Sequence, residues 1–189
     1  LVTGSTKGIG RAIAEQLAAE GCNLGICARN AEDVDKAMTE LSAHGVKVVG
    51  SAVDISDAKA LDDWVASCAE QLGGVDTLVA NVSAGGGEVT EETWRNTFEV
   101  DLMGTVRSVN AARPHLEKSS CGSIVIISST AAIEAFMGAG PYAALKAALL
   151  NYSGNLSQDL AGAGIRVNAV SPGPILVEGG AWDNIRDAM

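Results

Sequence analysis

The feature that most constrains the fold of this chain is a regular alternation of short apolar runs with longer helical patterns. Several runs are apolar throughout, as in Ile124–Ile127, which is typical of strands buried on both faces of a sheet. Strands that alternate with helices predict an α/β fold: a doubly wound parallel sheet with helices on both faces, in a single domain over residues 1–189. The expected strands are Leu1-Val2, Asn23–Ala28, Val46–Val53, Thr77–Ala80, Ser123–Ile127 and Arg166–Val170.

Two helical segments between these strands each have an apolar face. Residues three and four positions apart share one face of a helix, so such a stripe predicts the side that packs against the sheet. In Gly8–Glu20 the stripe consists of Ile9, Ile13 and Leu17. In Asp57–Leu72 it consists of Leu61, Trp64, Val65 and Cys68.

Both ends of the pattern are incomplete for such a fold. The first run has only two residues before a turn, whereas a buried parallel strand needs about five. Residues 178–189 begin a helical pattern that no strand follows. We therefore expect the chain to lack the start of its first strand and a C-terminal strand.

The charge and cysteine content of the chain exclude several classes of partner. Its formal net charge of -10 repels nucleic acids and anionic membrane surfaces, and no apolar run is long enough to span a bilayer. The cysteines contain no CxxC pair, and neither histidine lies at a metal-ligand spacing from them. We expect no nucleic-acid partner, no membrane, no metal site, and a reducing, cytoplasmic location.

A glycine-rich turn follows the first expected strand and opens the first expected helix. Glycines at this place let the backbone turn tightly and approach a pyrophosphate at the helix N-terminus. A glycine triplet alone is common by chance, but its position at the start of an α/β pattern predicts a dinucleotide site rather than a plain tight turn. The residues expected to contact the cofactor here are Gly4, Ser5, Thr6, Lys7, Gly8, Ile9 and Gly10.

The end of the second expected strand indicates which dinucleotide is preferred. In dinucleotide folds an acid there binds the ribose 2′-hydroxyl, whereas an arginine accommodates a 2′-phosphate. Here Arg29 and Asn30 follow the strand, with no acid at its tip, and Lys7 in the glycine turn is expected beside the same corner. Two cations converging on one phosphate predict that NADP(H) is preferred over NAD(H). The alternative is that both cations simply face solvent.

A tyrosine and a lysine four residues apart begin the last long helical pattern. At this spacing Tyr142 and Lys146 share one helix face, and Pro141 suits the first turn. A free phenol keeps its proton near neutral pH, and a neighbouring ammonium favours the ionised form that acid/base catalysis requires. Such a pair alone is common and usually without meaning. Ser129, however, follows a buried strand at the sheet edge where ligand sites gather, so its hydroxyl is placed to bind a substrate oxygen.

Three segments together resemble one known family, the short-chain dehydrogenases/reductases. They are the glycine turn, the set of Ser129, Tyr142 and Lys146, and the segment 168–173, all in the family's order and spacing. The resemblance covers essentially the whole chain, and the joint match is highly specific. It implies a Rossmann-type fold and hydride transfer between NADP(H) and a small-molecule carbonyl or secondary alcohol.

The resemblance also implies a role for each matching residue. Tyr142 is expected to act as general acid/base, Lys146 to bind the nicotinamide ribose and favour the phenolate, and Ser129 to polarise the carbonyl. Asp54 is expected at the adenine, Asn81 beside the adenosine, and the Pro-Gly turn beside the nicotinamide. Cofactor contacts outside the glycine turn and the strand tip are thus expected at Asp54, Ile55, Asn81, Tyr142, Lys146, Pro172, Gly173 and Ile175.

Three positions depart from the family's pattern. Where the family has Asn-Asn-Ala-Gly, this chain ends the stretch with Ala84, and three glycines follow directly. Asp101 stands where members often have an asparagine that supports a proton relay through water. An aspartate still accepts a hydrogen bond but adds charge, so we count Asp101 as a candidate catalytic residue whose part in the relay is open. Val177 replaces a threonine that commonly contacts the nicotinamide amide.

The substrate pocket in this family lies between the loop before the tyrosine and the segment after the Pro-Gly turn. A mainly apolar wall there suits a neutral ketone or acyl group, although some of these side chains could equally pack in the core. The candidates are Phe136, Met137, Leu176 and Trp182.

The resemblance further implies a homodimer or homotetramer, and it leaves two other functions open. One is reduction of a 3-oxoacyl thioester on a carrier protein, which the negative net charge disfavours because such carriers are acidic. The other is a redox sensor that binds NADP(H) without turnover. The intact set of Ser129, Tyr142 and Lys146 disfavours the sensor.

Overall fold

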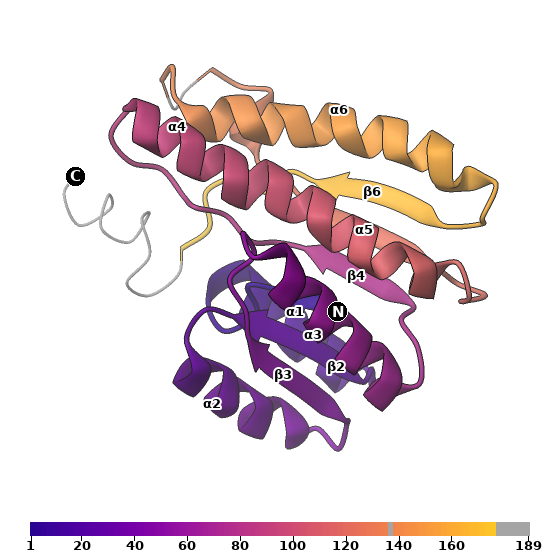
Figure 1. Ribbon diagram of the computed structural model, residues 1–189. Helices are drawn as coiled ribbons and strands as arrows, with labels where there is room; N and C mark the ends of the chain where they lie inside the picture. Colours follow the sequence, from indigo (N-terminus) through magenta and orange to yellow (C-terminus); the bar gives the residue numbers. More distant parts are fainter. Residues whose placement is uncertain (136–137, 177–189) are drawn as a thin grey trace.

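The computed structural model describes residues 1–135 and 138–176. These residues form a parallel sheet of six strands in the order β3-β2-β1-β4-β5-β6, covered by helices (Figure 1). The predicted α/β fold with a doubly wound parallel sheet is therefore confirmed. The strands are β1 (Val2–Thr3), β2 (Leu24–Ala28), β3 (Val48–Ala52), β4 (Thr77–Ala80), β5 (Ser123–Ile127) and β6 (Arg166–Val170).

The helices lie on both faces of this sheet. Right-handed connections place α1 and α2 on one face and α3, α5 and α6 on the other. Helix α4, the π-helix η1 and α5 follow one another without a break, and α4 and η1 pack against α6 (Figure 1). The helices are α1 (Gly8–Ala19), α2 (Ala31–Ser42), α3 (Ala58–Leu72), α4 (Glu91–Thr97), η1 (Phe98–Met103), α5 (Gly104–Leu116), the 3-10 turn η2 (Thr130–Ala132) and α6 (Pro141–Ala161).

The predicted boundaries of the strands hold to within about two residues, but the alternating pattern gave no bounds for the helix α2. Its sequence is rich in charged residues, which obscure the buried stripe of Val34, Ala37 and Leu41. Asn30 caps its N-terminus, because the Asn30 side chain accepts a hydrogen bond from the Asp33 N–H at 2.9 Å.

The face that α1 turns towards the sheet is wider than predicted. Ile13 and Leu17 of the predicted stripe are half-buried and pack against the buried cluster of Val2, Val79 and Ile127 on the strands. The sequence did not indicate the adjacent row of Gly10, Ala14 and Ala18, one turn apart, which is buried. Small side chains in this row allow the helix to approach β1 and β2 closely, which a row of branched residues would prevent. The stripe predicted for α3 is confirmed, since Leu61, Trp64, Val65 and Cys68 are all buried.

The parallel arrangement brings the loops that follow the strands to one edge of the sheet. The glycine turn follows β1, Arg29 follows β2, and the segment beginning at Asn81 follows β4. Ser128 and Ser129 follow β5. The sheet thus gathers most of the predicted site residues although they are far apart in the sequence.

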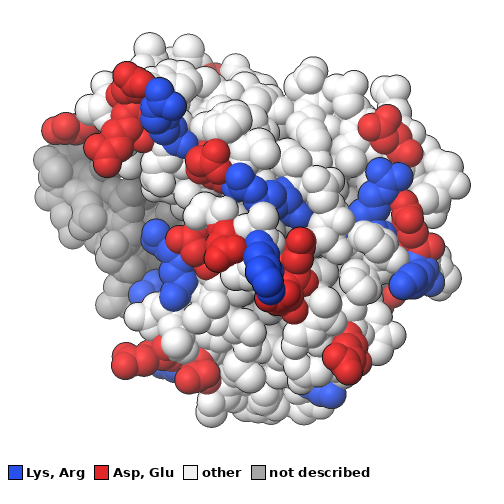
Figure 2. Space-filling model, in the orientation of Figure 1, with Lys and Arg blue, Asp and Glu red and all other residues white. Residues whose placement is uncertain are grey.

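The charged side chains are interspersed on the face shown in Figure 2. Pairs one helical turn apart, such as Arg95 with Glu91 and Arg113 with Glu117, bring opposite charges together. Exposed pairs of this kind contribute only about 0.3–0.5 kcal/mol each. Within residues 1–135 and 138–176, no helix combines the length and apolar character needed to cross a membrane.

We predict that the four cysteines divide into two reactive and two protected thiols. Cys22 and Cys121 are exposed, whereas burial raises the pKa of Cys27 to about 12 and that of Cys68 to about 11. Because the thiolate is the nucleophile, the buried pair stays protonated and unreactive at pH 8. Titration with a chromogenic disulfide should therefore modify two thiols rapidly in the native protein and all four in denaturant. Rapid modification of Cys27 without unfolding would contradict this.

Candidate functional site

An open cleft of about 930 Å³ lies at the carboxyl ends of the strands. It extends from the glycine turn past the tips of β2 and β3 to the loop after β4 and to α4. Its size suits a dinucleotide better than a single small metabolite. Of the residues predicted to contact a cofactor, those lining the cleft are Gly4, Thr6, Lys7, Arg29, Asn30, Asp54, Ile55 and Asn81.

The glycine turn holds its shape through positive backbone angles and hydrogen bonds to β2. Gly4 has φ 64° and Gly8 has φ 57°, in the left-handed region that glycine adopts most readily. The backbone N–H groups of Gly4 and Ser5 both donate to the carbonyl of Cys27, and so does the Ser5 hydroxyl. Ser5 is fully buried, so its side chain anchors the turn from beneath and does not face the cleft.

Gly10 forms the floor on which this turn rests. A Cβ atom added at Gly10 would lie 2.2 Å from the Gly4 carbonyl oxygen and 2.4 Å from Asn81 Nδ2. That Asn81 amide donates to the carbonyls of Thr3 and Gly4 at 3.0 Å and 3.2 Å. Asn81 therefore fastens the end of β4 to the turn after β1, a role that the sequence did not indicate.

The N-terminus of α1 opens towards this turn. Its N-cap residue is Lys7, and no side chain caps the helix there. The first N–H groups of a helix without a side-chain cap are available to a bound anion, and the helix dipole favours negative charge at that end. The tight turn, which the missing Cβ of Gly10 lets pack against the helix, and the uncapped helix N-terminus together fit the pyrophosphate of a dinucleotide.

At the tip of β2, the structure adds an acid to the cations that the sequence indicated. Lys7 Nζ lies 2.8 Å from Asp33 Oδ2, and Asp33 lines the cleft together with Arg29 and Lys7. The Lys7 side chain is 76% exposed, so this ion pair is weak and can be exchanged for another anion. Asp33 lies in the first turn of α2, a helix for which the sequence pattern gave no bounds, and sequence reasoning missed it for that reason.

Asp54 and Ile55 follow β3 on the adenine side of the cleft. Ser56 donates hydrogen bonds from its hydroxyl and its backbone N–H to Asp54, and these hold the pKa of the Asp54 carboxyl below its usual value. Ile55 is buried and packs against Gly104, where no larger residue would fit. Ile55 is thus mainly a core residue, and Asp54 is a charged group at the cleft wall.

The two serines after β5 have different functions in the structure. The Ser128 hydroxyl donates to the backbone carbonyl of Lys146 at 2.8 Å and so fixes α6 to the end of β5. The Ser129 hydroxyl accepts a hydrogen bond from the Ala131 N–H at 3.2 Å and caps η2, which packs against α6. Its proton remains free for a substrate oxygen, because capping uses the hydroxyl only as an acceptor.

Tyr142 and Lys146 lie on the first turns of α6, whose first residue is Pro141. Tyr142 is half-buried, and Lys146 Nζ lies 5.8 Å from the centroid of its ring. Only 3% of the Lys146 side chain is exposed. Its ammonium donates to the carbonyl of Ile127 at 3.1 Å, so the end of β5 also fixes the charged group.

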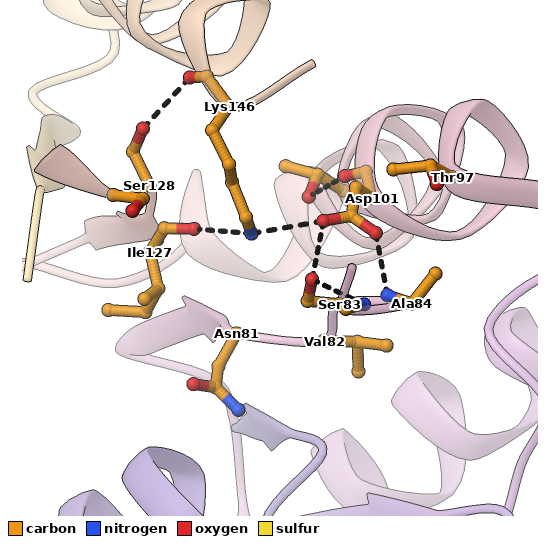
Figure 3. A network of polar contacts seen from close by, with 12 residues as sticks. Asn81, Val82, Ser83, Ala84, Thr97, Asp101, Ile127, Ser128 and Lys146 are labelled. Atoms are coloured by element: carbon orange, nitrogen blue, oxygen red, sulfur yellow. Dashed lines mark hydrogen bonds and ion pairs between the residues drawn. The ribbon is translucent and has the colours of Figure 1, made fainter. Parts of the chain in front are cut away.

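Asp101 lies in η1 and is fully buried against this lysine. Its Oδ2 atom is 3.2 Å from Lys146 Nζ. Figure 3 shows the carboxylate between Lys146 on one side and Ser83 and Ala84 on the other. The structure therefore brings Asp101 into direct contact with the predicted catalytic lysine, and it adds Ser83, which the sequence showed only as part of a departing motif.

The segment after β6 runs past the turn that holds Ser129. The Pro172 carbonyl accepts a hydrogen bond from the Thr130 N–H at 3.0 Å, while Gly173, Ile175 and Leu176 are exposed. The predicted pocket residues Phe136, Met137 and Trp182 lie outside the described residues.

Beside Tyr142 is a smaller pocket of about 110 Å³. Its walls come from the three glycines after Ala84, from α4 and from the loop before α6. The sequence showed these glycines only as the residues after Ala84 and did not assign them to a pocket wall. The residues lining it include Gly85, Gly86, Gly87, Thr93, Asn96 and Gly140.

Within residues 1–135 and 138–176, no group of three or more His, Cys, Asp or Glu side chains is placed to hold a metal ion. The described site presents hydroxyl, ammonium and carboxylate groups on Ser129, Tyr142, Lys146 and Asp101. A doubly wound sheet with a glycine turn and a cleft at its carboxyl edge defines the class of dinucleotide-binding α/β proteins.

The short chain dehydrogenase family model matches residues 1–185, and the chain belongs to this family. It is thus an oxidoreductase that uses a nicotinamide cofactor. Among its relatives is isoepoxydon dehydrogenase patN of Penicillium expansum, which is 40% identical over 187 residues, 97% of this chain and 72% of that protein.

Two solved structures are similar to this chain and contain different cofactors. L-sorbose reductase of Gluconobacter frateurii, complexed with NADPH and L-sorbose, has a TM-score of 0.89 and 33% identity over 94% of this chain and 70% of that chain. Carveol dehydrogenase of Mycobacterium avium, in complex with NAD, has a TM-score of 0.85 and 28% identity over 90% of this chain and 68% of that chain. The fold alone therefore does not select between the two dinucleotides.

We predict that Gly10→Ala destabilises the protein through the glycine turn. The added methyl group would overlap the Gly4 carbonyl oxygen and the Asn81 side-chain amide, and neither group can move without disrupting the hydrogen bonds of the turn. The free energy of unfolding, measured by urea denaturation, should fall by about 2–3 kcal/mol.

Gly154→Ala in α6 provides the matched control. No atom lies within 4 Å of a Cβ added there, so this change should raise the stability by about 0.5–1 kcal/mol, as expected for a helix interior. Equal stabilities of the Gly10→Ala and Gly154→Ala proteins would show that the turn tolerates a side chain.

Proposed function

We propose that this protein is an NADP(H)-dependent oxidoreductase that transfers a hydride between the nicotinamide and a carbonyl or secondary alcohol, with Tyr142 as general acid/base. The observation that carries the proposal is the buried Lys146 ammonium, held 5.8 Å from the centroid of the Tyr142 ring. A cation fixed beside a phenol stabilises its ionised form, which a catalytic tyrosine must reach near neutral pH.

The residues around Tyr142 divide the work of a carbonyl reduction. The Tyr142 hydroxyl donates its proton to the carbonyl oxygen as that oxygen becomes negative, and it recovers the proton in the reverse reaction. Ser129 donates a hydrogen bond from its hydroxyl to the same oxygen and keeps its proton. The Ile127 carbonyl and the Asp101 carboxylate fix the position of the Lys146 ammonium beside Tyr142. The nicotinamide, when bound, supplies or accepts the hydride.

The glycine turn and the cleft supply the residues that would hold the dinucleotide. The pyrophosphate would rest on the turn at the start of α1, which keeps its shape because Gly10 has no Cβ to displace the Gly4 carbonyl. Arg29 and Lys7 line the corner where a 2′-phosphate would be held, and this favours NADP(H). The phosphate would compete with Asp33 for Lys7, so we expect Arg29 to contribute most of the selectivity.

Two further parts of the proposal concern the substrate and the assembly. The small pocket beside Tyr142 suits a compact alcohol or ketone, in keeping with a relative named as a dehydrogenase of isoepoxydon and a similar structure complexed with L-sorbose.

Trp94 and Phe98 are exposed one turn apart along α4 and the start of η1. An apolar face of this kind favours association into a homodimer or homotetramer.

We predict that Tyr142→Phe lowers kcat by about a hundredfold or more without unfolding the protein, because only a proton-transfer group is removed. Tyr152→Phe is the matched control, since Tyr152 lies on the same helix and also loses only a hydroxyl. The measurement is NADPH oxidation with a panel of ketones, sugars and oxoacyl thioesters. If Tyr142→Phe and Tyr152→Phe retain equal activity, the proposed mechanism is wrong.

For the cofactor, we predict a KM for NADPH below that for NADH, and a loss of this preference in Arg29→Ala. Removal of one charge-assisted contact should raise the KM for NADPH about tenfold and leave that for NADH nearly unchanged. Arg166→Ala removes an exposed arginine on β6 and is expected to change neither value. A wild-type preference for NADH would overturn the assignment of NADP(H).

A further inference from the structure

Asp101, which departs from the family's pattern, contacts Ser83, a neighbour of the departing Ala84, in the folded protein. Ser83 lies in the segment after β4 and Asp101 in η1, 18 positions later. The Ser83 hydroxyl donates to Asp101 Oδ2 at 2.7 Å, and the Ala84 N–H donates to Asp101 Oδ1 at 2.7 Å (Figure 3). Both oxygens of this buried carboxylate are therefore held from the side of β4.

The same carboxylate is the only acidic group paired with Lys146 among residues 1–135 and 138–176. Oδ2 accepts the hydrogen bond from the Ser83 hydroxyl and also forms the ion pair with the Lys146 ammonium, 3.2 Å away. A buried carboxylate is stable in its charged form only where donors surround it. Ser83 supplies a donor that an alanine at this position could not provide.

Asp101 lies in the π-helix η1, which connects α4 to α5. In a π-turn the backbone is wider than in an α-helix, and such turns are frequent at functional sites. The Asp101 carbonyl accepts a hydrogen bond from the Thr105 hydroxyl at 2.7 Å, so the side chain of Thr105 stabilises the backbone at the end of the turn. Asp101 is thereby held between α6 and the segment after β4.

We propose that Ser83 is a positioning residue for Lys146 that acts through Asp101, so that residues 83 and 101 work as a coupled pair. The inference rests on the proposed function, in which Lys146 acts on Tyr142. The Ser83 hydroxyl fixes the orientation of the carboxylate, and the carboxylate in turn draws the ammonium to one place beside the tyrosine ring. Without the hydroxyl, the carboxylate can rotate about its Cβ–Cγ bond, and the ammonium loses a fixed partner.

The first test measures the Lys146 ammonium directly, without cofactor. In protein with ¹⁵N-labelled lysine, a buried and hydrogen-bonded ammonium exchanges its protons slowly and gives an NMR signal, which Lys146→Arg identifies by its loss. Asp101→Asn and Ser83→Ala should both shift or broaden this signal, and Ser83→Thr should restore it. If Ser83→Ala leaves the signal unchanged while Asp101→Asn moves it, the proposal is overturned.

Ser119→Ala is the matched control for this experiment. The Ser119 hydroxyl also donates to an aspartate, Asp76, but that pair lies at the opposite end of β4 from Ser83. Its loss removes a hydrogen bond of the same chemistry and should leave the Lys146 signal in place. A shift as large as that of Ser83→Ala would mean that the signal reports general loosening, and it would also overturn the proposal.

The second test uses kinetics on the full chain with NADPH and a ketone that it reduces. Ser83→Ala should lower kcat about tenfold with little change in either KM, and Ser83→Thr should recover most of the loss. Because the two residues act as one unit, the double variant Ser83→Ala/Asp101→Asn should lose no more than Asp101→Asn alone. Losses that multiply in the double variant would show that the residues act independently.

The results of the two tests distinguish a failure of the proposed coupling from a failure of the proposed function. If the wild-type protein binds no NADP(H) and reduces no carbonyl, the proposed function is wrong, and the NMR experiment still decides whether Ser83 controls the position of Lys146. If the wild-type protein is active and Ser83→Ala leaves the Lys146 NMR signal unchanged, the proposed function stands and the coupling between Ser83 and Lys146 is rejected.

Discussion

The buried ion pair between Lys146 and Asp101 joins segments that are distant in the sequence. Two charges removed from water cost several kcal/mol each, and mutual attraction recovers this only where further hydrogen bonds complete both groups. Here the Ile127 carbonyl accepts a hydrogen bond from the ammonium, while the Ser83 hydroxyl and the Ala84 N–H donate hydrogen bonds to the carboxylate. Such a pair contributes more to the relative positions of α6, η1 and the segment after β4 than to stability. The geometry around Tyr142 follows from it.

The two halves of the sheet contribute different parts of the site. Strands β1 to β3 end in the glycine turn, the cation at Arg29 and the wall at Asp54, which together form a dinucleotide cleft. Strands β4 and β5 end in the groups that surround Tyr142. Asn81 connects the halves, because its side chain fastens the end of β4 to the turn after β1. A rigid sheet edge thus fixes the distance between the cofactor cleft and the acid/base group.

The sequence predicted those features that depend on local pattern. Continuous apolar runs predicted the buried strands, and helical spacing placed Tyr142 and Lys146 on one face. The charged surface of α2 obscured its buried stripe, so Asp33 was missed with it. The close packing of α1 depends on small residues that carry little hydrophobic signal. The Ser83–Asp101 contact was not predictable, because it spans 18 positions and one partner lies in a π-turn that no residue pattern specifies.

The hydrogen bond between Ser83 and Asp101 also limits how this protein can change over evolutionary time. A mutation to alanine at position 83 alone would leave a fully buried carboxylate short of a donor. A mutation to asparagine at position 101 alone would keep one oxygen for the Ala84 N–H, and its amide N–H could donate to the Ser83 hydroxyl oxygen. Descendants that return to the common family residues are therefore expected to replace the aspartate first and the serine second.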